Sequence, residues 1–305
     1  MTGFGRAIRS LEEARVAYRI RKPQAGGELD LWISQKDMRA AEPAILRAGF
    51  FPFEAPGLGE HRFFLSFEPA SGAWLKLDVK LEVGTALRRG RVTSALARRR
   101  PLAARRLGPV IAVLGPDGAG KGTMISGIGE LCPVAVTQVY LGRRKRPASG
   151  AILREERPSL ASRVLPQSAL LIWKALRDLR RLLPAYTAAW RGHIVLCDRH
   201  PIEVLAVLPD RSPTARRVER FIARHLIPWP DLILLLDAPT GQLRQRKREH
   251  PKEVLDRWRR GYVDAFVPRG AVVISTAGSR EQSLRHASRA VWLALGSRRR
   301  WRPLS

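Results

Sequence analysis

Cysteine is scarce in this sequence, which has only Cys132 and Cys197 among 305 residues. Both lie among apolar neighbours, so we expect buried free thiols rather than a disulfide or a pair of metal ligands. Histidine is also sparse, and no group of histidines and cysteines in the sequence has the spacing of a zinc site. These absences argue against a disulfide-stapled or zinc-stabilised protein.

Long apolar runs are missing as well. No segment of the sequence approaches the roughly 18–20 uncharged residues that a membrane-spanning helix needs. Residues 1–20 carry charges where a signal peptide needs its apolar segment. We therefore expect a cytoplasmic protein without a transmembrane segment. No internal repeat is apparent either.

Acidic residues are few relative to basic ones, 27 against 55, which gives a net charge of +28. This excess favours contact with nucleic acid, anionic lipid, polyphosphate or phosphorylated small molecules, although a biased genome would produce the same composition. The basic residues are densest at 88–106, 143–146 and 298–302, and the first of these segments is typical of an interdomain linker. The length of the chain and its 45% hydrophobic residues favour two domains.

A glycine-rich turn with one lysine, GPDGAGKGT at 115–123, directly follows the apolar run 110–114. A phosphate loop needs a buried strand, a turn whose backbone N–H groups approach the phosphate, and a helix whose N-terminus faces the anion. The run 110–114 predicts the strand, and residues 124–131 predict the helix. Lys121 is then expected to reach the β- and γ-phosphates of a nucleotide. The residues expected to contact the nucleotide are Gly115, Asp117, Gly118, Ala119, Gly120, Lys121, Gly122 and Thr123.

Gly122 stands where a serine or threonine normally gives its hydroxyl to Mg²⁺. The metal is therefore expected to be held through water by a carboxylate elsewhere. Asp198 is the candidate, because it follows the apolar run 193–197, and the working residues of open α/β sheets lie beyond the carboxyl ends of the strands. Asp198 is suited to holding Mg²⁺-bound water or accepting a proton, and Arg199 to clamping a phosphate.

A third buried strand is expected over 230–239, and a basic helical stretch around Arg246 follows it. Mobile arginines that close over the γ-phosphate are a recurring way to stabilise the charge of phosphoryl transfer, although an exposed basic helix would have the same sequence. Arg246 is the residue of this stretch that we expect to act.

The loop GPDGAGKGT after a strand, CDRH at 197–200, and PDLILLLDAP at 230–239 together resemble the thymidylate kinase-like branch of the P-loop nucleotide kinases. The resemblance covers residues 108–296. It implies a three-layer α/β sandwich with a five-stranded parallel sheet, and ATP and Mg²⁺ as cofactors. The catalytic residues that it implies are Lys121, Asp198, Arg199 and Arg246.

The segment that would handle the acceptor differs from that family. Thymidylate kinases follow their second strand with an Arg-Glu-Pro-Gly-Gly type segment, whereas here the strand expected at 134–140 runs into the basic segment 141–147. This segment resembles that of divergent thymidylate kinase-like proteins found beside polysaccharide-synthesis enzymes. We therefore expect an anionic small-molecule acceptor, nucleotide or glycan-related, other than dTMP.

Two carboxylates of the N-terminal half, Glu28 and Asp30, are two residues apart on an expected strand, so both point to one face. Asp78 is expected to join them from a neighbouring strand, and three such carboxylates suit two-metal nucleotidyl transfer. With Gly26-Gly27 before the acidic pair, residues 10–85 resemble the nucleotidyltransferase fold. A solvated strand face with a structural aspartate is the alternative.

The other elements expected in this half are strands at 17–21 and 28–33, a helix at 36–48, and a hairpin of 61–67 with 73–80. The domains expected for the whole chain are a nucleotidyltransferase-like α+β domain (1–87), a basic linker (88–107), a thymidylate kinase-like domain (108–296) and a mobile basic tail (297–305).

Residues 167–191 repeat apolar side chains at helical spacing, with arginines between them. A helix that faces the core and carries a basic outer stripe would show this pattern, and so would a helix at a membrane surface.

The function expected from the sequence is an ATP-dependent phosphotransferase that transfers the γ-phosphate of a nucleoside triphosphate donor to the anionic acceptor. Two alternatives stay open. One is a nucleic-acid-binding protein or polynucleotide 5′-end kinase, and the other is a catalytically degenerate nucleotide-binding scaffold. The oligomeric state stays open too, with a homodimer among the possibilities.

Overall fold

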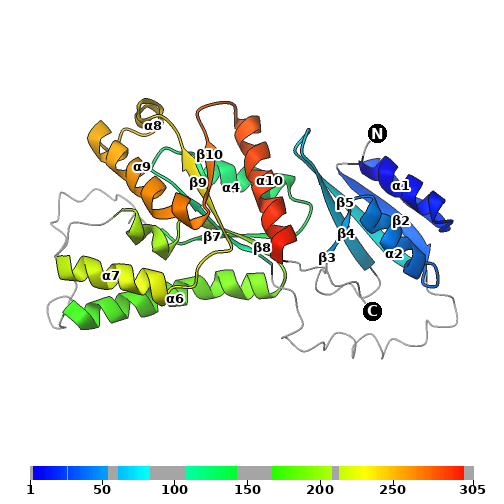
Figure 1. The fold of residues 1–305 in the computed structure, drawn as a ribbon, viewed down its shortest axis with the longest axis horizontal. Helices are drawn as coiled ribbons and strands as arrows, with labels where there is room; N and C mark the ends of the chain where they lie inside the picture. Colours follow the sequence, from blue (N-terminus) through cyan, green and yellow to red (C-terminus); the bar gives the residue numbers. More distant parts are fainter. Residues whose placement is uncertain are drawn as a thin grey trace, which may run out of the picture.

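The structure is a computed structural model, and it describes residues 3–25, 27–53, 61–82, 108–142, 167–207 and 213–298. The linker expected at 88–107 and the arginine-rich segment 143–146 lie outside these residues. The described chain forms two five-stranded sheets, one in each half (Figure 1).

The N-terminal sheet has the strand order β1-β2-β5-β4-β3. Its strands are β1 (Tyr18–Ala25), β2 (Glu28–Ser34), β3 (Phe51–Phe53), β4 (His61–Glu68) and β5 (Ala73–Glu82). Strands β2 and β5 pair in parallel, and the other neighbours are antiparallel, including the predicted β4–β5 hairpin. The helices α1 (Gly3–Glu13) and α2 (Met38–Arg47) share one buried core with this sheet.

Strand β2 shows how the sequence pattern places side chains in this sheet. Leu29, Leu31 and Ile33 are buried, and the residues between them are half-buried. This alternation follows from the two-residue period of a strand, which sends successive side chains to opposite faces. Glu28 and Asp30 therefore share the face that α1 and α2 leave uncovered.

The second sheet has the order β10-β9-β6-β8-β7, and every pair of neighbours is parallel. Its strands are β6 (Val110–Leu114), β7 (Val136–Tyr140), β8 (Ile194–Asp198), β9 (Leu232–Asp237) and β10 (Val272–Ser275). The predicted five-stranded parallel sheet is therefore confirmed. All five residues of the central strand β6 are buried, as expected for a parallel strand covered on both faces.

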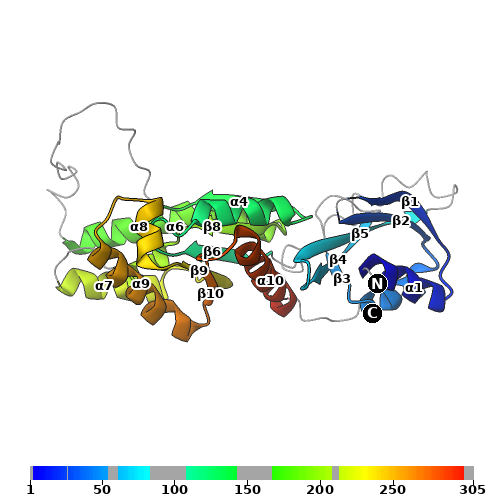
Figure 2. The same ribbon diagram turned by 90° about the horizontal axis from the view of Figure 1, so that it is seen from above.

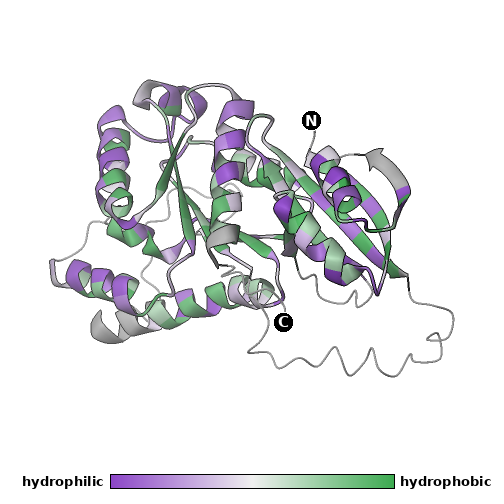
Figure 3. Ribbon diagram, turned by 45° about the vertical axis from the view of Figure 1, so that its right-hand side comes forward, coloured by the Kyte–Doolittle hydropathy of each residue, from purple (hydrophilic) through white to green (hydrophobic). Residues whose placement is uncertain are grey.

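Helices cover both faces of the parallel sheet, so that apolar residues gather on the strands and on the helix sides turned toward them (Figure 3). The helices are α4 (Lys121–Leu131), α6 (Gln167–Trp190), α7 (Pro213–His225), α8 (Thr240–Arg246), α9 (Lys252–Phe266) and α10 (Arg280–Arg298), with the 3-10 turns η3 (Pro201–Leu205) and η4 (Val267–Arg269). One face packs with α4 and α10, and the other packs with α6, α7 and α9. The result is an α/β sandwich of three layers.

Three expected limits shift by a few residues. Helix α4 begins at Lys121 rather than at 124, so the lysine stands in the first helical turn. Asp198 is the last residue of β8 rather than the first residue after it. Helix α10 continues to Arg298, two residues past the expected domain limit of 296 and into the segment that we expected to be a mobile tail.

Helix α10 joins the two halves, because it packs on the N-terminal sheet (Figures 1 and 2). The ring of Trp292 lies 5.5 Å from Phe51, 6.4 Å from Phe67 and 5.5 Å from Trp74, between ring centroids. Residues of the N-terminal sheet and of the parallel sheet consequently belong to one continuous hydrophobic cluster. The two expected domains meet through this aromatic contact.

Cys132 and Cys197 are buried free thiols, as predicted. Burial raises the pKa of the Cys132 thiol to about 11 and that of Cys197 to about 12. Neither thiol is therefore suited to nucleophilic or redox chemistry at neutral pH. In the part of the chain that the structure describes, no helix is both long and apolar enough to span a bilayer.

Candidate phosphate-binding site

The glycine-rich loop connects the centre of the parallel sheet to the N-terminus of α4. Gly118 has φ +86°, and a Cβ at this position would lie 2.6 Å from the carbonyl oxygen of Leu243. Gly120 has φ +84° and is the N-cap of α4. Only glycine adopts these left-handed backbone angles at little cost, so the two residues fix the turn that brings backbone N–H groups around one point.

Lys121 bends back over this loop. Its side chain is buried, and its Nζ donates hydrogen bonds to the carbonyl oxygens of Gly115 (2.8 Å) and Pro116 (2.9 Å). Burial and the neighbouring charge of Arg199 lower the pKa of the Lys121 ammonium. The nearest carboxylate oxygen is Oδ1 of Asp117, 3.9 Å from the Nζ, and a phosphate placed at the loop would be a second anionic partner.

Asp198 lies beside the start of the loop, because β8 is the neighbour of β6. In the parallel register Asp198 stands next to Val113, two residues before Gly115. Its Oδ1 is buried, and among the described residues no hydrogen-bond donor reaches that atom. The charge of Asp198 partly opposes the net lowering of the Lys121 pKa, so the carboxylate and the ammonium are close enough to interact.

These residues fit a Mg²⁺ ion held through water. A buried carboxylate oxygen without a protein donor is the kind of ligand that a hard cation or its bound water prefers. A Cβ at Gly122 would meet no atom within 4 Å, so there is open space where the usual hydroxyl is missing. Asp198 would supply the protein ligand, and the remaining ligands would come from water and phosphate oxygens.

A network of charged and polar side chains lies behind the loop. Nη2 of Arg199 donates to Oδ1 of Asp117 at 2.5 Å, and Nη1 donates to Oε2 of Glu203 at 3.5 Å. Glu203 also accepts a hydrogen bond from the hydroxyl of Tyr262 at 2.9 Å. Arg199 has φ +69°, a left-handed angle that is unusual for a residue with a side chain. The network and the backbone together fix the guanidinium beside the loop.

The pKa values of the side chains in this network shift in opposite directions. Burial by itself would raise the pKa of Asp117, but the charges of Arg199, Lys121 and Lys247 outweigh it, and the net shift is downward. Burial raises the pKa of Glu203, and Arg199 only partly compensates. Burial opposes the charge of Arg199, but Glu203 and Asp117 prevail and raise its pKa. The loop is therefore flanked by a permanently charged arginine.

Comparison with known proteins gives similar structures only. No protein-family model matches the chain, and no curated protein matches it. A thymidylate kinase from Candida albicans aligns with a TM-score of 0.41 and 14% identity, over 63% of this chain and 92% of that one. A thymidylate kinase from Ehrlichia chaffeensis aligns with a TM-score of 0.36 and 17% identity, over 61% and 98%. At this level of similarity, the geometry of the chain's own residues carries the functional inference.

Arg246, which we expected to close over the γ-phosphate, is bound elsewhere in this structure. Its guanidinium donates to the carbonyl oxygen of Thr276 at 2.7 Å and to the Thr276 hydroxyl at 3.3 Å. His250, in the loop between α8 and α9, approaches the phosphate loop instead, with its Nε2 3.5 Å from Oδ2 of Asp117. The α8–α9 segment thus contacts the loop through a residue that the sequence analysis did not single out.

Arg259 of α9 anchors the α8–α9 segment to the end of strand β9. Its Nε and Nη2 donate to the two carboxylate oxygens of Asp237 at 2.7 and 2.8 Å, in a bidentate pair at the end of β9. Asp256 accepts a hydrogen bond from Thr240 at the start of α8. These contacts hold α9 and the start of α8 at the carboxyl end of strand β9.

The three N-terminal carboxylates lie together as predicted. Oxygen atoms of Glu28, Asp30 and Asp78 lie within 4.8 Å of one another. Two of them already have a basic partner, because Lys76 donates to Glu28 at 2.6 Å and the Nδ1 of His61 lies 2.7 Å from Asp78. Metal binding at these residues, and with it a nucleotidyltransferase activity, stays a prediction.

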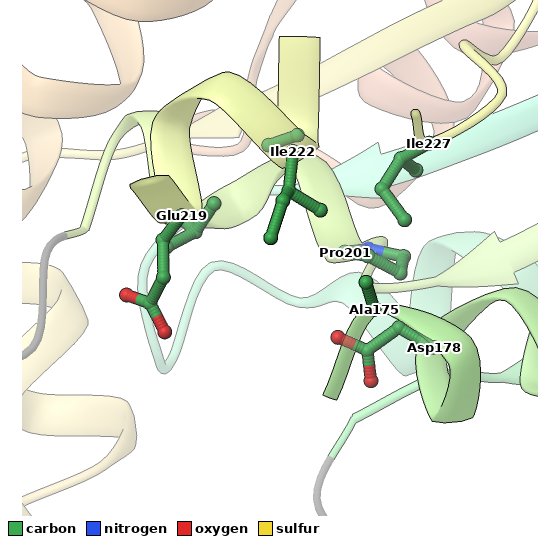
Figure 4. A pocket seen from close by; sticks show the side chains of 8 residues that line it. Ala175, Asp178, Pro201, Glu219, Ile222 and Ile227 are labelled. Carbon is green, nitrogen blue, oxygen red and sulfur yellow. The ribbon is translucent and has the colours of Figure 1, made fainter. Parts of the chain in front are cut away.

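A small, open hollow lies between α6, η3 and α7 (Figure 4). The carboxylates of Asp178 and Glu219 face it, and its other lining residues are Ala175, Pro201, Val204, Ile222, Ala223 and Ile227. Two carboxylates would repel a phosphate group. This hollow is therefore unsuited to the phosphate of an anionic acceptor, which leaves Arg199 as the better partner.

Proposed function

We propose that the chain is an ATP-dependent kinase of the thymidylate kinase-like type, and that it transfers the γ-phosphate to an anionic small-molecule acceptor other than dTMP. The observation that carries the proposal is the convergence of Lys121 and Asp198 at the carboxyl end of neighbouring parallel strands. Ligands of open α/β sheets bind at such a point, where the chain turns to opposite sides of the sheet. The net charge of +28 supports anionic substrates.

In this proposal the loop residues Gly115 to Thr123 bind the triphosphate through their backbone N–H groups, and Lys121 leaves its two carbonyl partners for the β- and γ-phosphates. Asp198 would hold water of a Mg²⁺ ion, and the ion would supply positive charge against the phosphate oxygens. Asp198 is also the residue suited to accept the proton of the acceptor. Each of these groups lies within the first residues after β6 or at the end of β8.

Arg199 and Arg246 have separate tasks. Arg199 binds phosphate from a fixed position, because Asp117 and Glu203 already orient its guanidinium. Arg246 would have to exchange Thr276 for the γ-phosphate when the α8–α9 segment closes. Arginines are suited to both tasks, since the planar guanidinium binds phosphate oxygens in pairs.

The test is phosphoryl transfer from γ-labelled ATP to a panel of dTMP, other nucleotides, sugar phosphates, polyphosphate and oligonucleotides. We expect transfer to an anionic small molecule and a loss of at least about 100-fold for Lys121→Ala, since such electrostatic contacts contribute about 10²–10³ in rate. Lys252→Ala, an exposed lysine of α9, is the matched control and should keep full activity. Full activity of Lys121→Ala would exclude Lys121 as the donor residue.

The same experiment separates the alternatives. Transfer confined to oligonucleotide 5′ ends, with binding that weakens steeply as salt rises, would identify a polynucleotide kinase instead. Binding of ATP and Mg²⁺ in titration calorimetry without transfer to any acceptor of the panel would identify a nucleotide-binding scaffold that has lost catalysis, and failure to bind them would refute the proposed kinase.

A further inference from the structure

Helix α6 exposes a stripe of large apolar side chains along its outer side. Trp173 is 52% exposed, Leu176 56%, Leu183 61% and Trp190 50%. At about 100° per residue these four positions fall within an arc of roughly 100°, and the exposed Arg180 lies inside the same arc. The stripe runs for about 25 Å, since a helix rises about 1.5 Å per residue.

The core of the domain does not use this stripe. The opposite side of α6 packs on the parallel sheet through residues that are nearly fully buried: Ala175, Leu182, Ala185 and Ala189. An aromatic side chain can bury about 150–250 Å², so each half-exposed tryptophan leaves on the order of 100 Å² in water. Together with the two leucines, the stripe reaches the few hundred Å² that mark an interaction surface on a soluble protein.

The charges around the stripe are basic. The guanidinium of Arg177 lies over the ring of Trp173, 5.2 Å from its centroid, and Arg180 extends to solvent from the middle of the stripe. Asp178 is the single acid in the sequence of α6, and it is paired with Arg177 at 3.4 Å and mostly buried. Among the described side chains of α6, those beside the apolar surface are basic, apart from Asp178, which pairs with Arg177.

Helix α7 packs beside α6 (Figure 1), and it too carries an exposed aromatic side chain among exposed arginines. Its Phe221 is well exposed, and three exposed arginines surround it in the sequence: Arg217, Arg220 and Arg224. The basic and apolar character of this side of the molecule thus extends beyond one helix.

We propose that the stripe formed by Trp173, Leu176, Arg180, Leu183 and Trp190 binds the surface of an anionic lipid bilayer, with α6 lying parallel to the membrane. Amphipathic helices that lie in the interface have this length, apolar residues with tryptophan on one side, and arginines that meet anionic headgroups. Tryptophans at both ends suit the headgroup level, where an indole ring is partly apolar and partly hydrated.

A second copy of the chain fits the stripe less well. A twofold pairing of two such stripes would bring the Arg180 residues of the copies against one another near the axis, since Arg180 lies close to the midpoint between Trp173 and Trp190. Like charges in that position oppose association, whereas an anionic headgroup neutralises both arginines. The charge of the stripe therefore favours lipid over self-association.

The experiment measures co-sedimentation of the full chain with vesicles of phosphatidylcholine alone and with about one third phosphatidylglycerol. We expect binding to the anionic vesicles, weakened in high salt because screening reduces the headgroup attraction. The double variant Leu176→Gln/Leu183→Gln should bind at least about 10-fold more weakly, because it removes apolar area from the contact. Arg180→Glu should lose binding to the anionic vesicles specifically.

The matched control is Leu293→Gln on α10, a leucine that is 60% exposed outside the stripe and whose replacement should leave vesicle binding unchanged. Thermal unfolding of each variant checks that the fold is retained. Equal binding to both vesicle types, or equal losses in the α6 and α10 variants, would overturn the proposal. It would also be overturned if the α6 variants changed the oligomeric state or duplex-oligonucleotide binding in place of vesicle binding.

Discussion

Replacing Trp292 by alanine should loosen the contact between the N-terminal sheet and α10. The indole of Trp292 packs with three aromatic rings, those of Phe51, Phe67 and Trp74. Each aromatic pair contributes about 0.5–1.5 kcal/mol beyond the burial of its area. Because the three pairs share one partly buried ring, we expect Trp292→Ala to lower the free energy of unfolding by about 2–4 kcal/mol.

The assay is thermal unfolding followed by calorimetry and circular dichroism. A loss of this size should lower the Tm by about 4–16 °C, since 1 kcal/mol corresponds to roughly 2–4 °C in a domain of 150–250 residues. The unfolding transition should also split, because the N-terminal sheet then melts without α10. Leu293→Ala is the control on the same helix, where the exposed side chain makes little contact. Trp292→Phe should recover part of the loss.

A small and equal decrease of the Tm in Trp292→Ala and Leu293→Ala would refute the packing of α10 against β3, β4 and β5. A single undivided transition in Trp292→Ala would refute the inference that this contact joins two otherwise separable halves.

Three further predictions concern the site. Gly118→Ala should lower stability by at least about 1 kcal/mol and weaken ATP binding in calorimetry, because a Cβ there meets the Leu243 carbonyl at a left-handed φ; unchanged ATP affinity would contradict this loop geometry. Asp198→Asn should reduce phosphoryl transfer by about 10²-fold or more while metal-free ATP still binds, and an unchanged transfer rate would remove Asp198 from the site. Glu203 has a raised pKa, so its folded state retains a proton that the unfolded chain loses near pH 4.5, and stability should fall as pH rises through the folded pKa. Glu203→Gln, measured by urea unfolding across pH, should abolish that fall, whereas a profile parallel to that of the native protein would refute the assignment.

Three of the five strands of the parallel sheet could be predicted from the sequence because they are short apolar runs with clear limits. Residues 110–114, 193–197 and 230–239 each match a strand within two residues at either end. The position of Asp198 beside the loop could also be predicted, because parallel strands bring their carboxyl ends to one edge. Local pattern and a general rule of sheet geometry were enough in both cases.

Helix α1 was missed although its signal is present. Phe4, Ala7 and Leu11 recur at helical spacing and are buried, but charged residues separate them in the sequence. The contact between α10 and the N-terminal sheet was missed for a different reason. Strand β4 is buried along five consecutive residues, and such a run indicates cover on both faces without saying which distant helix provides it.

Within the site, the side chains that act through tertiary contacts could not be predicted from the sequence. Glu203 stands four residues after Arg199, a spacing that would have suggested a pair on one helical face. Tyr262 and His250 have no comparable local signal, because they reach Glu203 and Asp117 only through the packing of α9 and the loop before it. Arg246 was predicted from its charge alone. Its contact with Thr276 could not be predicted, because Thr276 is 30 residues away in the sequence.

The side of α10 that faces the N-terminal sheet limits which sequence changes this helix can accept. Arg285 donates to the carbonyl oxygen of Ala70, and Trp292, two turns further on, meets the aromatic rings of the same sheet. Inserting or deleting one residue between them would turn Trp292 by about 100° around the helix axis and remove it from those rings. Length variation in this helix is therefore costly between these two positions, while single substitutions on its solvent side, such as at Leu293, are free to accumulate.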